Sequence, residues 1–410
     1  MSSKTVAIIG QGYVGLPLAM AATSAGWNVV GIDINKKTVA NLNLGKSHIE
    51  DISDQILQKS ISANAYKASE DFTDVENADV VVICVPTPLN DKREPDLAFL
   101  NGAVTAVAQH LKKDVLLISE STSYPGTVRD VVTGIVSTLR EDKGAGILLA
   151  SAPERVDPGN EKYNHKNTPR LVSGLTPEAT KKAAEFYRSF TEAVIEVSSP
   201  EVAETAKLLE NTFRQVNIAL VNEVAIISRA LGIDVREVIE AANSKPYGFM
   251  KFTPGAGVGG HCIPVDPSYF SWRAKQVGAQ ARFIDLANEV NDQMPIYVSD
   301  RLLKLIGKSA TGLNLLICGV AYKPGVGDVR ETPADGVAEY LVSLGAKINW
   351  HDPLVESWRG QERSPLTGKY DGAIVVTPQP GMDLSPLVAA KTPIFDCTGE
   401  YKNLPLVEQL

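Results

Sequence analysis

One cysteine in this sequence lies in a setting that suits a nucleophile. Residues 255–267 read GAGVGGHCIPVDP, so four glycines precede Cys262 and Asp266 follows it. Glycines let the backbone adopt positive φ angles and approach a ligand closely, and Pro264 and Pro267 stiffen the chain that follows. The alternative is a small buried hydrophobic residue, which is the common fate of a free cysteine. We interpret Cys262 as a reactive thiol on a tight loop.

A second motif lies at the N-terminus. Residues 5–9 form an apolar run typical of a buried parallel strand, and they lead directly into GQGYVG, a helix and a second strand that ends at Asp33. The order strand, glycine motif, helix, strand, acid predicts a dinucleotide site whose pyrophosphate sits at the helix N-terminus. Asp33 should bind ribose hydroxyls and repel a 2′-phosphate, which favours NAD over NADP, although Lys36 and Lys37 lie nearby. The predicted cofactor-binding residues here are Gly10, Gly12, Tyr13, Val14, Gly15 and Asp33.

Further polar residues come directly after predicted strands. Strands are expected at 79–85, 114–119 and 147–150. Thr87, Thr122 and Glu154 follow these strands in turn. Ligands of parallel sheets sit at the carboxyl ends of the strands, so all three are site candidates. Both threonines could equally be turn residues, whereas Glu154 leaves its strand directly before Arg155 and is the stronger candidate.

The elements that must position these residues predict an α/β protein. Strand and helix alternate to about residue 199, and the pattern restarts without the glycine fingerprint after residue 309. We expect two Rossmann-like doubly wound domains, at 1–199 and 309–410, joined by a long central helix and a small helical domain at 200–308.

The long helix is expected at 201–231. Apolar residues occupy more than one of its faces, so it should be buried by several partners, bridge two domains and supply a homodimer interface. Lys207 and Asn211 lie one turn apart on it. They could be a surface pair, but a lysine near Cys262 would favour the thiolate, and we adopt that interpretation.

Composition excludes several classes of protein. The 410 residues carry a net charge of −8, which argues against a nucleic-acid binder. The four cysteines are scattered without metal spacing, so no metal site is expected, and Cys84 and Cys318 lie in apolar runs typical of buried strands. With neither a signal peptide nor a membrane span in the sequence, we expect a cytoplasmic location.

Five separated motifs together resemble the UDP-glucose/GDP-mannose dehydrogenase family. They are GQGYVG with Asp33, APERVDPGN (152–160), AKLLENTFRQVN (206–217), GVGGHCIPVDP (257–267) and GVAYKPGVGDVRETP (319–333). The resemblance covers nearly the whole chain. It implies an NAD-binding domain at 1–199, a central dimerisation domain at 200–308 and a UDP-sugar-binding domain at 309–410.

The resemblance also implies residue roles. Cys262 would attack the sugar aldehyde, Lys207 and Asn211 would steady the oxyanion, and Asp266, Thr122 and Glu154 would handle the hydrolytic water. Thr87, Thr122 and Arg330 would contact NAD. The implied substrate-binding residues are Glu154, Arg155, Lys207, Asn211, Gly259 and Lys323. His261 is a further candidate base, although adjacent residues need not point the same way.

The implied reaction is the NAD-dependent four-electron oxidation of a UDP-sugar at C6. The run PYGFMKFTPGAGVGG is most similar to UDP-N-acetylglucosamine dehydrogenases, so that sugar is the first choice, UDP-N-acetylmannosamine the second and UDP-glucose the third. A two-electron hydroxyacid dehydrogenase and a non-enzymatic NAD-binding scaffold are the competing interpretations. One departure from the family is that Cys397, rather than an arginine, follows Asp396, which puts one cofactor or interface contact in doubt.

Overall fold

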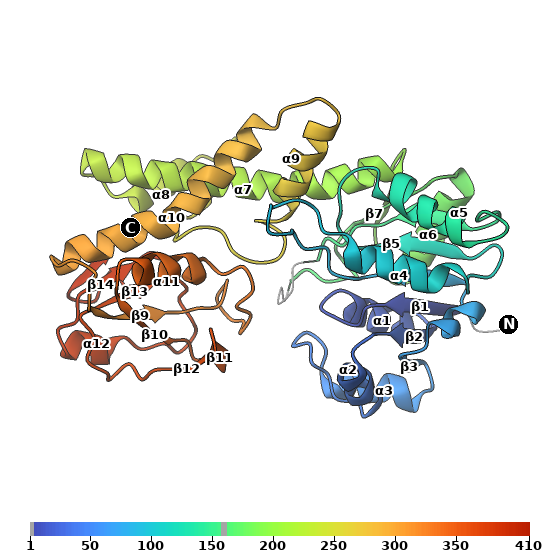
Figure 1. The fold of residues 1–410 in the computed structure, drawn as a ribbon, viewed down its shortest axis with the longest axis horizontal. Coiled ribbons are helices and arrows are strands. Elements are labelled where there is room, and N and C mark those ends of the chain that lie inside the picture. The colour runs from blue at the N-terminus through green and yellow to red at the C-terminus, as the bar shows by residue number, and fades with distance from the viewer. Residues whose placement is uncertain (1–3, 157–161) are drawn as a thin grey trace. The chain divides into compact units, whose positions relative to one another are not determined.

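The computed structural model describes residues 4–156 and 162–410. Its contacts divide the chain into two compact units. Unit 1 comprises Met1–Glu210 and Trp272–Val277, and unit 2 comprises Asn211–Ser271 and Gly278–Leu410. Helix α7 (Pro200–Leu231) contributes residues to both units, and Figure 1 shows the elements of each unit.

Unit 1 contains an eight-stranded sheet of order β3-β2-β1-β4-β5-β6-β7-β8. Its strands are β1 (Thr5–Ile9), β2 (Asn28–Ile32), β3 (Tyr66–Ser69), β4 (Val80–Ile83), β5 (Leu116–Ser119), β6 (Leu148–Ser151), β7 (Arg170–Gly174) and β8 (Val194–Glu196). The pairing from β3 to β6 is parallel throughout, which fits strands buried on both faces and rich in Val, Ile and Leu.

Alternating side chains of this sheet build two cores. Val6 and Ile8 pack with α1 (Gly15–Ser24) and α6 (Pro177–Arg188) on one face, as expected for a side-chain period of two. Ala7 and Ile9 pack with α4 (Ala98–Ala108) and α5 (Thr133–Leu139) on the other. Helices α2 (Lys36–Asn43) and α3 (Asp54–Ser62) follow β2 and start at the capping side chains of Asn35 and Ser53.

The last two strands of the sheet reverse its direction. β7 pairs antiparallel with β6 and parallel with β8. The first residue of β7, Arg170, therefore lies at the edge where β4, β5 and β6 end.

Unit 2 contains a five-stranded parallel sheet of order β10-β9-β13-β14-β15. Its strands are β9 (Asn314–Cys318), β10 (Lys347–His351), β13 (Gly372–Val375), β14 (Ile394–Asp396) and β15 (Val407–Gln409). Helices α10 (Arg282–Ile306) and α11 (Pro333–Ser343) cover one face, as Figure 1 shows, and α12 (Ser385–Ala389) packs on the other. The remaining elements of unit 2 are α8 (Val235–Asn243), the hairpin of β11 (Ser357–Trp358) and β12 (Gln361–Glu362), and most of α9 (Asp266–Gln276).

As in a dinucleotide-binding sheet, an aspartate follows a strand of the unit 2 sheet, but this aspartate forms its hydrogen bonds within the protein. Asp352, directly after β10, is fully buried and accepts hydrogen bonds from the backbone N–H groups of Val320 and Ala321 at 2.9 and 3.1 Å. The Leu354 N–H and the Gln379 side chain also donate to it. The Asp352 carboxylate is therefore hydrogen-bonded within the protein and does not face a ribose.

The predicted α/β class is confirmed, and most predicted strands and helices lie within a few residues of their observed bounds. The elements absent from the prediction are the strands β3, β11, β12 and β15 and the helices α2, α3, α5, α6 and α12. In the described part of the chain, none of the helices combines the length and hydrophobicity of a membrane span.

Candidate active site

The glycine motif of unit 1 forms a tight turn between β1 and α1. A Cβ atom on Gly15 would lie 1.8 Å from the Gly10 carbonyl oxygen, and Gly10 itself has a φ of +90°. A Cβ on Gly12 would meet no atom within 4 Å, so its backbone faces open space. Helix α1 begins after Val14, with no side-chain cap and no acidic residue in its first turn. The positive end of the helix dipole can therefore attract an anion.

Asp33 follows β2 and is anchored by its neighbours. Its carboxylate accepts hydrogen bonds from the backbone N–H groups of Gln11 and Asn35 at 2.9 and 2.8 Å. The buried Gln11 side chain accepts a hydrogen bond from Tyr66 and donates one to Ile8. Each carboxylate oxygen of Asp33 retains a lone pair, so the group can still accept a ribose hydroxyl.

The structure brings Thr87 and Thr122 together at the ends of β4 and β5. The Thr87 hydroxyl donates to the Thr122 carbonyl oxygen at 2.6 Å. Between them, the Ser121 hydroxyl donates to the Val85 carbonyl oxygen at 2.8 Å. The two loops are thus joined where a parallel sheet binds its ligands.

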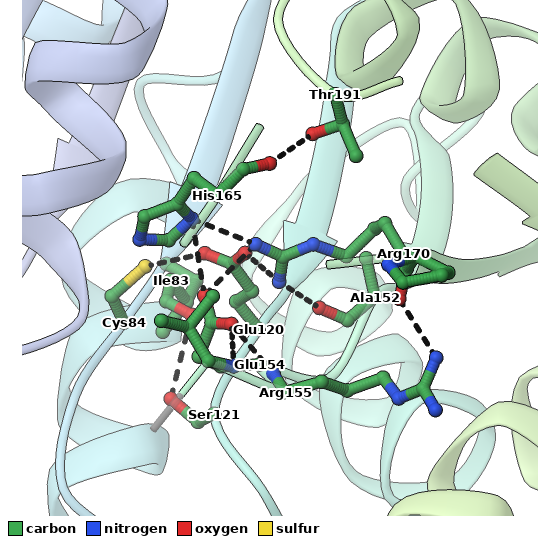
Figure 2. Close-up of polar contacts among 12 residues, drawn as sticks. Ile83, Cys84, Glu120, Ser121, Ala152, Glu154, Arg155, His165, Arg170 and Thr191 are labelled. Atoms are coloured by element: carbon green, nitrogen blue, oxygen red, sulfur yellow. Dashed lines mark hydrogen bonds and ion pairs between the residues drawn. The ribbon is translucent and has the colours of Figure 1, made fainter. Parts of the chain in front are cut away.

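Beside these loops lies a buried charge cluster, shown in Figure 2, that sequence reasoning did not find. Arg170 pairs with Glu120, and with Glu154 at 2.8 Å. The side chains of Glu120 and Arg170 are 0% and 3% exposed, whereas that of Glu154 is 10% exposed. The Cys84 thiol donates to Glu120 at 3.1 Å, and Arg170 also lies 3.1 Å from His165 Nδ1.

The two carboxylates of this cluster titrate in opposite directions. Burial raises the pKa of Glu120 to about 7, although Arg170 opposes this rise. Burial would also raise the pKa of Glu154, but Arg170, His165 and the Val156 N–H outweigh it and lower the pKa to about 2. Burial lowers the pKa of His165, so its ring is neutral at pH 7. Glu154 is therefore ionised at neutral pH, whereas Glu120 binds a proton as the pH falls through about 7.

Two predicted substrate residues, Arg155 and Lys207, lie in unit 1 in different surroundings. The Arg155 guanidinium pairs with Glu210 of α7 at 2.7 Å and donates to the Pro169 carbonyl oxygen at 2.7 Å. Lys207 is only 8% exposed. Within residues 4–156 and 162–410, its ammonium group makes no hydrogen bond or ion pair to the protein.

Unit 2 presents Cys262 at the start of α9. All four cysteines are described, and Cys262 alone is exposed. Its carbonyl oxygen accepts the N–H groups of Val265 and Asp266 at 3.2 and 2.8 Å, which starts the helix. The buried Asp266 side chain accepts a hydrogen bond from Asn211 of α7 at 2.5 Å. The structure thus joins two predicted catalytic residues, Asn211 and Asp266, and places them in the unit that carries the thiol.

The glycines before the cysteine are required by packing within unit 2. A Cβ on Gly259 would lie 2.9 Å from the Glu331 carbonyl oxygen, and one on Gly260 would lie 3.0 Å from the Tyr322 ring. The ring of His261 is turned to Asp328, at 3.1 Å, so His261 is held as the partner of a carboxylate.

Asp328 links the cysteine loop to Arg330. Arg330 donates to Asp328 through Nε and a terminal nitrogen, the latter at 2.7 Å. Although burial acts in the opposite direction, His261 and Arg330 hold the pKa of Asp328 well below its usual range. Lys323 and Gly259 belong to the same unit, with the Lys323 ammonium 5.9 Å from the Tyr322 ring centre.

The turn after β14 carries Cys397 where the family pattern has an arginine, and hydrogen bonds still fix this turn. Asp396 is fully buried and accepts hydrogen bonds from the N–H groups of Thr398 and Tyr401 at 2.7 and 3.0 Å. Arg236 of α8 donates to the Cys397 carbonyl oxygen at 3.1 Å. An arginine from another element therefore packs against this turn.

Comparison with known families gives three consecutive matches to the UDP-glucose/GDP-mannose dehydrogenase family. They are its NAD binding domain over residues 4–191, its central domain over 201–293 and its UDP binding domain over 316–401. The chain belongs to this family. It is an NAD-dependent dehydrogenase of UDP-sugars.

Individual relatives agree over most of their length. The UDP-N-acetyl-D-mannosamine dehydrogenase of Escherichia coli K12 is 37% identical over 366 residues, 86% of this chain and 84% of its own. The structure of UDP-D-ManNAc dehydrogenase from Pyrococcus horikoshii has a TM-score of 0.90 at 31% identity, covering 99% of this chain and 98% of that one. A UDP-glucose dehydrogenase from Pyrobaculum islandicum also reaches 0.90, at 26% identity, over 99% and 96%.

The geometry of unit 1 fits the NAD that this family uses. Gly12 leaves room for a pyrophosphate beside the α1 N-terminus, and Asp33 retains lone pairs for the ribose. No group of His, Cys, Asp and Glu side chains in the described parts of this dehydrogenase is arranged to hold a metal ion.

The predicted site residues fall into two sets because the chain forms two units. Those of unit 1 are Gly10, Gly12, Tyr13, Val14, Gly15, Asp33, Thr87, Thr122, Glu154, Arg155 and Lys207. Those of unit 2 are Asn211, Gly259, Cys262, Asp266, Lys323 and Arg330. Sequence reasoning missed Glu120, Arg170 and Asp328. Arg170 could have been found as a charged residue that opens an otherwise apolar strand.

Proposed function

We propose that this dehydrogenase oxidises the C6 hydroxyl of a UDP-N-acetylhexosamine to a carboxylate, with UDP-N-acetylmannosamine as the first candidate. The support is that relatives such as the E. coli enzyme, at 37% identity, carry that name. UDP-N-acetylglucosamine, the first choice from the sequence, becomes the second candidate, supported by the run at 246–260. UDP-glucose is third, because the fold is equally similar to a UDP-glucose dehydrogenase.

The observation that carries the proposal is the exposed thiol of Cys262 beside the Asn211–Asp266 pair. Bound NAD⁺ supplies the hydride acceptor for each of two oxidations. After the first, the Cys262 thiolate adds to the C6 aldehyde and forms a thiohemiacetal. Loss of the second hydride and of the hydroxyl proton gives a thioester. Water then adds, the C–S bond breaks, and the acid and the thiol are released. The overall change is alcohol, two NAD⁺ and water to carboxylate, two NADH and three protons.

Lys207 and Asn211 are proposed to stabilise the oxyanion intermediates. A lysine that is 8% exposed and has no partner in the described protein is available to a ligand. A fixed cation beside a developing oxyanion lowers its energy, and the same charge favours the thiolate. Glu154, Thr122 and Asp266 are proposed to orient and deprotonate the hydrolytic water.

Further contacts are proposed for the remaining predicted residues. Thr87, Thr122 and Arg330 would bind NAD. Gly259, Lys323 and Arg155 would bind the UDP-sugar. Because Glu210 now holds Arg155, contact with a phosphate would require that ion pair to open.

The domain organisation and the dimer also remain proposals. We assign the NAD-binding domain to 1–199, the central domain to 200–308 and the UDP-sugar domain to 309–410. Phe213, Leu220 and Ile227 of α7 are 46%, 53% and 50% exposed and recur every seven residues, so they share one face of the helix. This uncovered apolar face supports a homodimer through α7. Light scattering should give twice the chain mass for the wild type and a smaller mass for Leu220→Lys.

The experiment that tests the proposed function is an NADH count against a panel of UDP-sugars. Two NADH per sugar with one UDP-N-acetylhexosamine and release of the uronic acid are expected. One NADH per substrate would favour a two-electron hydroxyacid dehydrogenase. Binding of NAD without NADH from any sugar would favour the scaffold interpretation.

A further inference from the structure

The buried charge cluster behind Glu154 has no role in the reaction described so far. Glu154 and His165 lie on the wall of a cavity of about 1100 Å³ in unit 1. Arg170 and Glu120 do not line this cavity, and their side chains are buried. Of the two carboxylates of the cluster, Glu154 is thus the one that water can reach.

Every oxygen of Glu154 is held in place. One accepts the backbone N–H groups of Arg155 and Val156 at 2.5 and 2.7 Å. The other accepts Arg170 at 2.8 Å and lies 3.6 Å from His165 Nδ1. The two backbone N–H groups belong to the same loop as Glu154. Among the described residues, Arg170 is the arginine or lysine from another element that pairs with this carboxylate.

Arg170 is held in turn from three sides. Glu120 pairs with it, the Ala152 carbonyl oxygen accepts one of its N–H groups at 3.5 Å, and its guanidinium carbon lies 4.9 Å from the centre of the Tyr187 ring. One cation between two buried carboxylates leaves a net negative charge unless one carboxylate binds a proton. Charge balance therefore favours a state in which one carboxylate is ionised and the other binds a proton.

We propose that Arg170 is a positioning residue for Glu154, which it keeps ionised and fixed toward the cavity, and that Glu120 holds Arg170 and carries the proton of the cluster. The proposal rests on the proposed function, in which Glu154 handles the water that hydrolyses the thioester. The other titratable or charged groups that face the cluster from the described residues are Cys84, Asp51, Arg155, His165 and Tyr187.

The test uses Arg170→Lys and Arg170→Gln in the full-length enzyme, with Arg129→Gln as the matched control. Arg129 forms an exposed ion pair with Glu201 in the same unit. Loss of the cation should raise the acid limb of the pH–rate profile by about 1–3 pH units for Arg170→Gln. Arg170→Lys, which keeps the charge, should show little of this shift, so its acid limb should stay close to that of the wild type.

Impaired hydrolysis has its own kinetic signature. Arg170→Gln should release up to two NADH per site in a burst and then turn over about 10-fold or more slowly, with kcat/KM for the UDP-sugar changed less than about threefold because hydrolysis follows thioester formation. Arg129→Gln should match the wild type. An Arg170→Gln enzyme with wild-type burst, rate and pH profile would overturn the proposal. Should Arg170→Gln not fold, Arg170→Met, which also removes the charge, takes its place, and a wild-type burst, rate and acid limb in that variant would overturn the proposal equally.

An infrared titration of the free protein tests the cluster without any substrate. The wild type should show a protonated carboxyl band that disappears near neutral pH, and Glu120→Gln should lack it. Persistence of this band in Glu120→Gln would refute the assignment of the proton. This measurement stands even if no UDP-sugar yields NADH, an outcome that would count against the proposed function alone.

Discussion

Replacing Asp33 should change which dinucleotide this enzyme prefers. The carboxylate of Asp33 lies directly after β2 and is partly buried. Its loss removes charge-assisted hydrogen bonds to the ribose, each worth about 1.5–3 kcal/mol, so NAD should bind roughly 10- to 100-fold more weakly. It also removes the repulsion of a 2′-phosphate. At about 4 Å and an effective dielectric constant of 20 this repulsion amounts to about 4 kcal/mol, and partial exposure reduces it to about half.

The two effects act in the same direction on cofactor preference. In Asp33→Ala, the ratio of kcat/KM for NAD⁺ to that for NADP⁺ should fall by at least ~10²-fold. Asp33→Asn removes the charge but keeps an acceptor for the Gln11 or Asn35 N–H, so it should retain more NAD binding. Initial rates of NADH and NADPH formation at a fixed UDP-sugar concentration measure the ratio.

Asp352→Asn is the matched control for this prediction. Asp352 also follows a strand, but its carboxylate binds backbone N–H groups of its own unit. The substitution should lower the melting temperature and leave the cofactor ratio unchanged. A ratio that moves less than about threefold in both Asp33 variants would refute our interpretation of the glycine motif.

Three further predictions concern the thiol, the lysine and a buried acid. Cys262→Ser should form no uronic acid while Cys397→Ala, a buried cysteine of the same unit, stays active; product analysis decides this. Lys207→Ala should lower kcat by at least ~10²-fold, and a twofold loss in steady-state assays would make Lys207 structural. Burial raises the pKa of Glu204 from 4.5 to about 8, so the folded state binds the extra proton and stability falls as pH rises through that window. Calorimetry should show that the free energy of unfolding of Glu204→Gln depends less steeply on pH than that of the wild type. An unchanged pH dependence would contradict this.

Much of the fold follows from the sequence because buried parallel strands have a distinctive pattern. The run 5–9, the glycines after it and Asp33 predict both a local structure and a ligand, and the structure agrees with each element. Cys262 was also recognisable, because its neighbours restrict it to an exposed loop.

The buried charge cluster was not predictable in the same way. Arg170 and Glu120 are 50 residues apart in the sequence and meet only because β7 runs antiparallel to β6. Strand direction is set by long-range pairing, and no local pattern records it. The rule that ligands gather at the ends of strands therefore pointed to Glu154 and overlooked a residue at the beginning of one.

The placement of Arg170 within a strand has a consequence for sequence change. Ala150 and Ser151 pair with Gly174 and Ser173, so the ladder fixes which face of the sheet each residue of β7 occupies. One residue inserted between Arg170 and Ser173 would invert the orientation of the arginine and separate it from Glu154. Natural or engineered insertions should therefore be rejected inside β7.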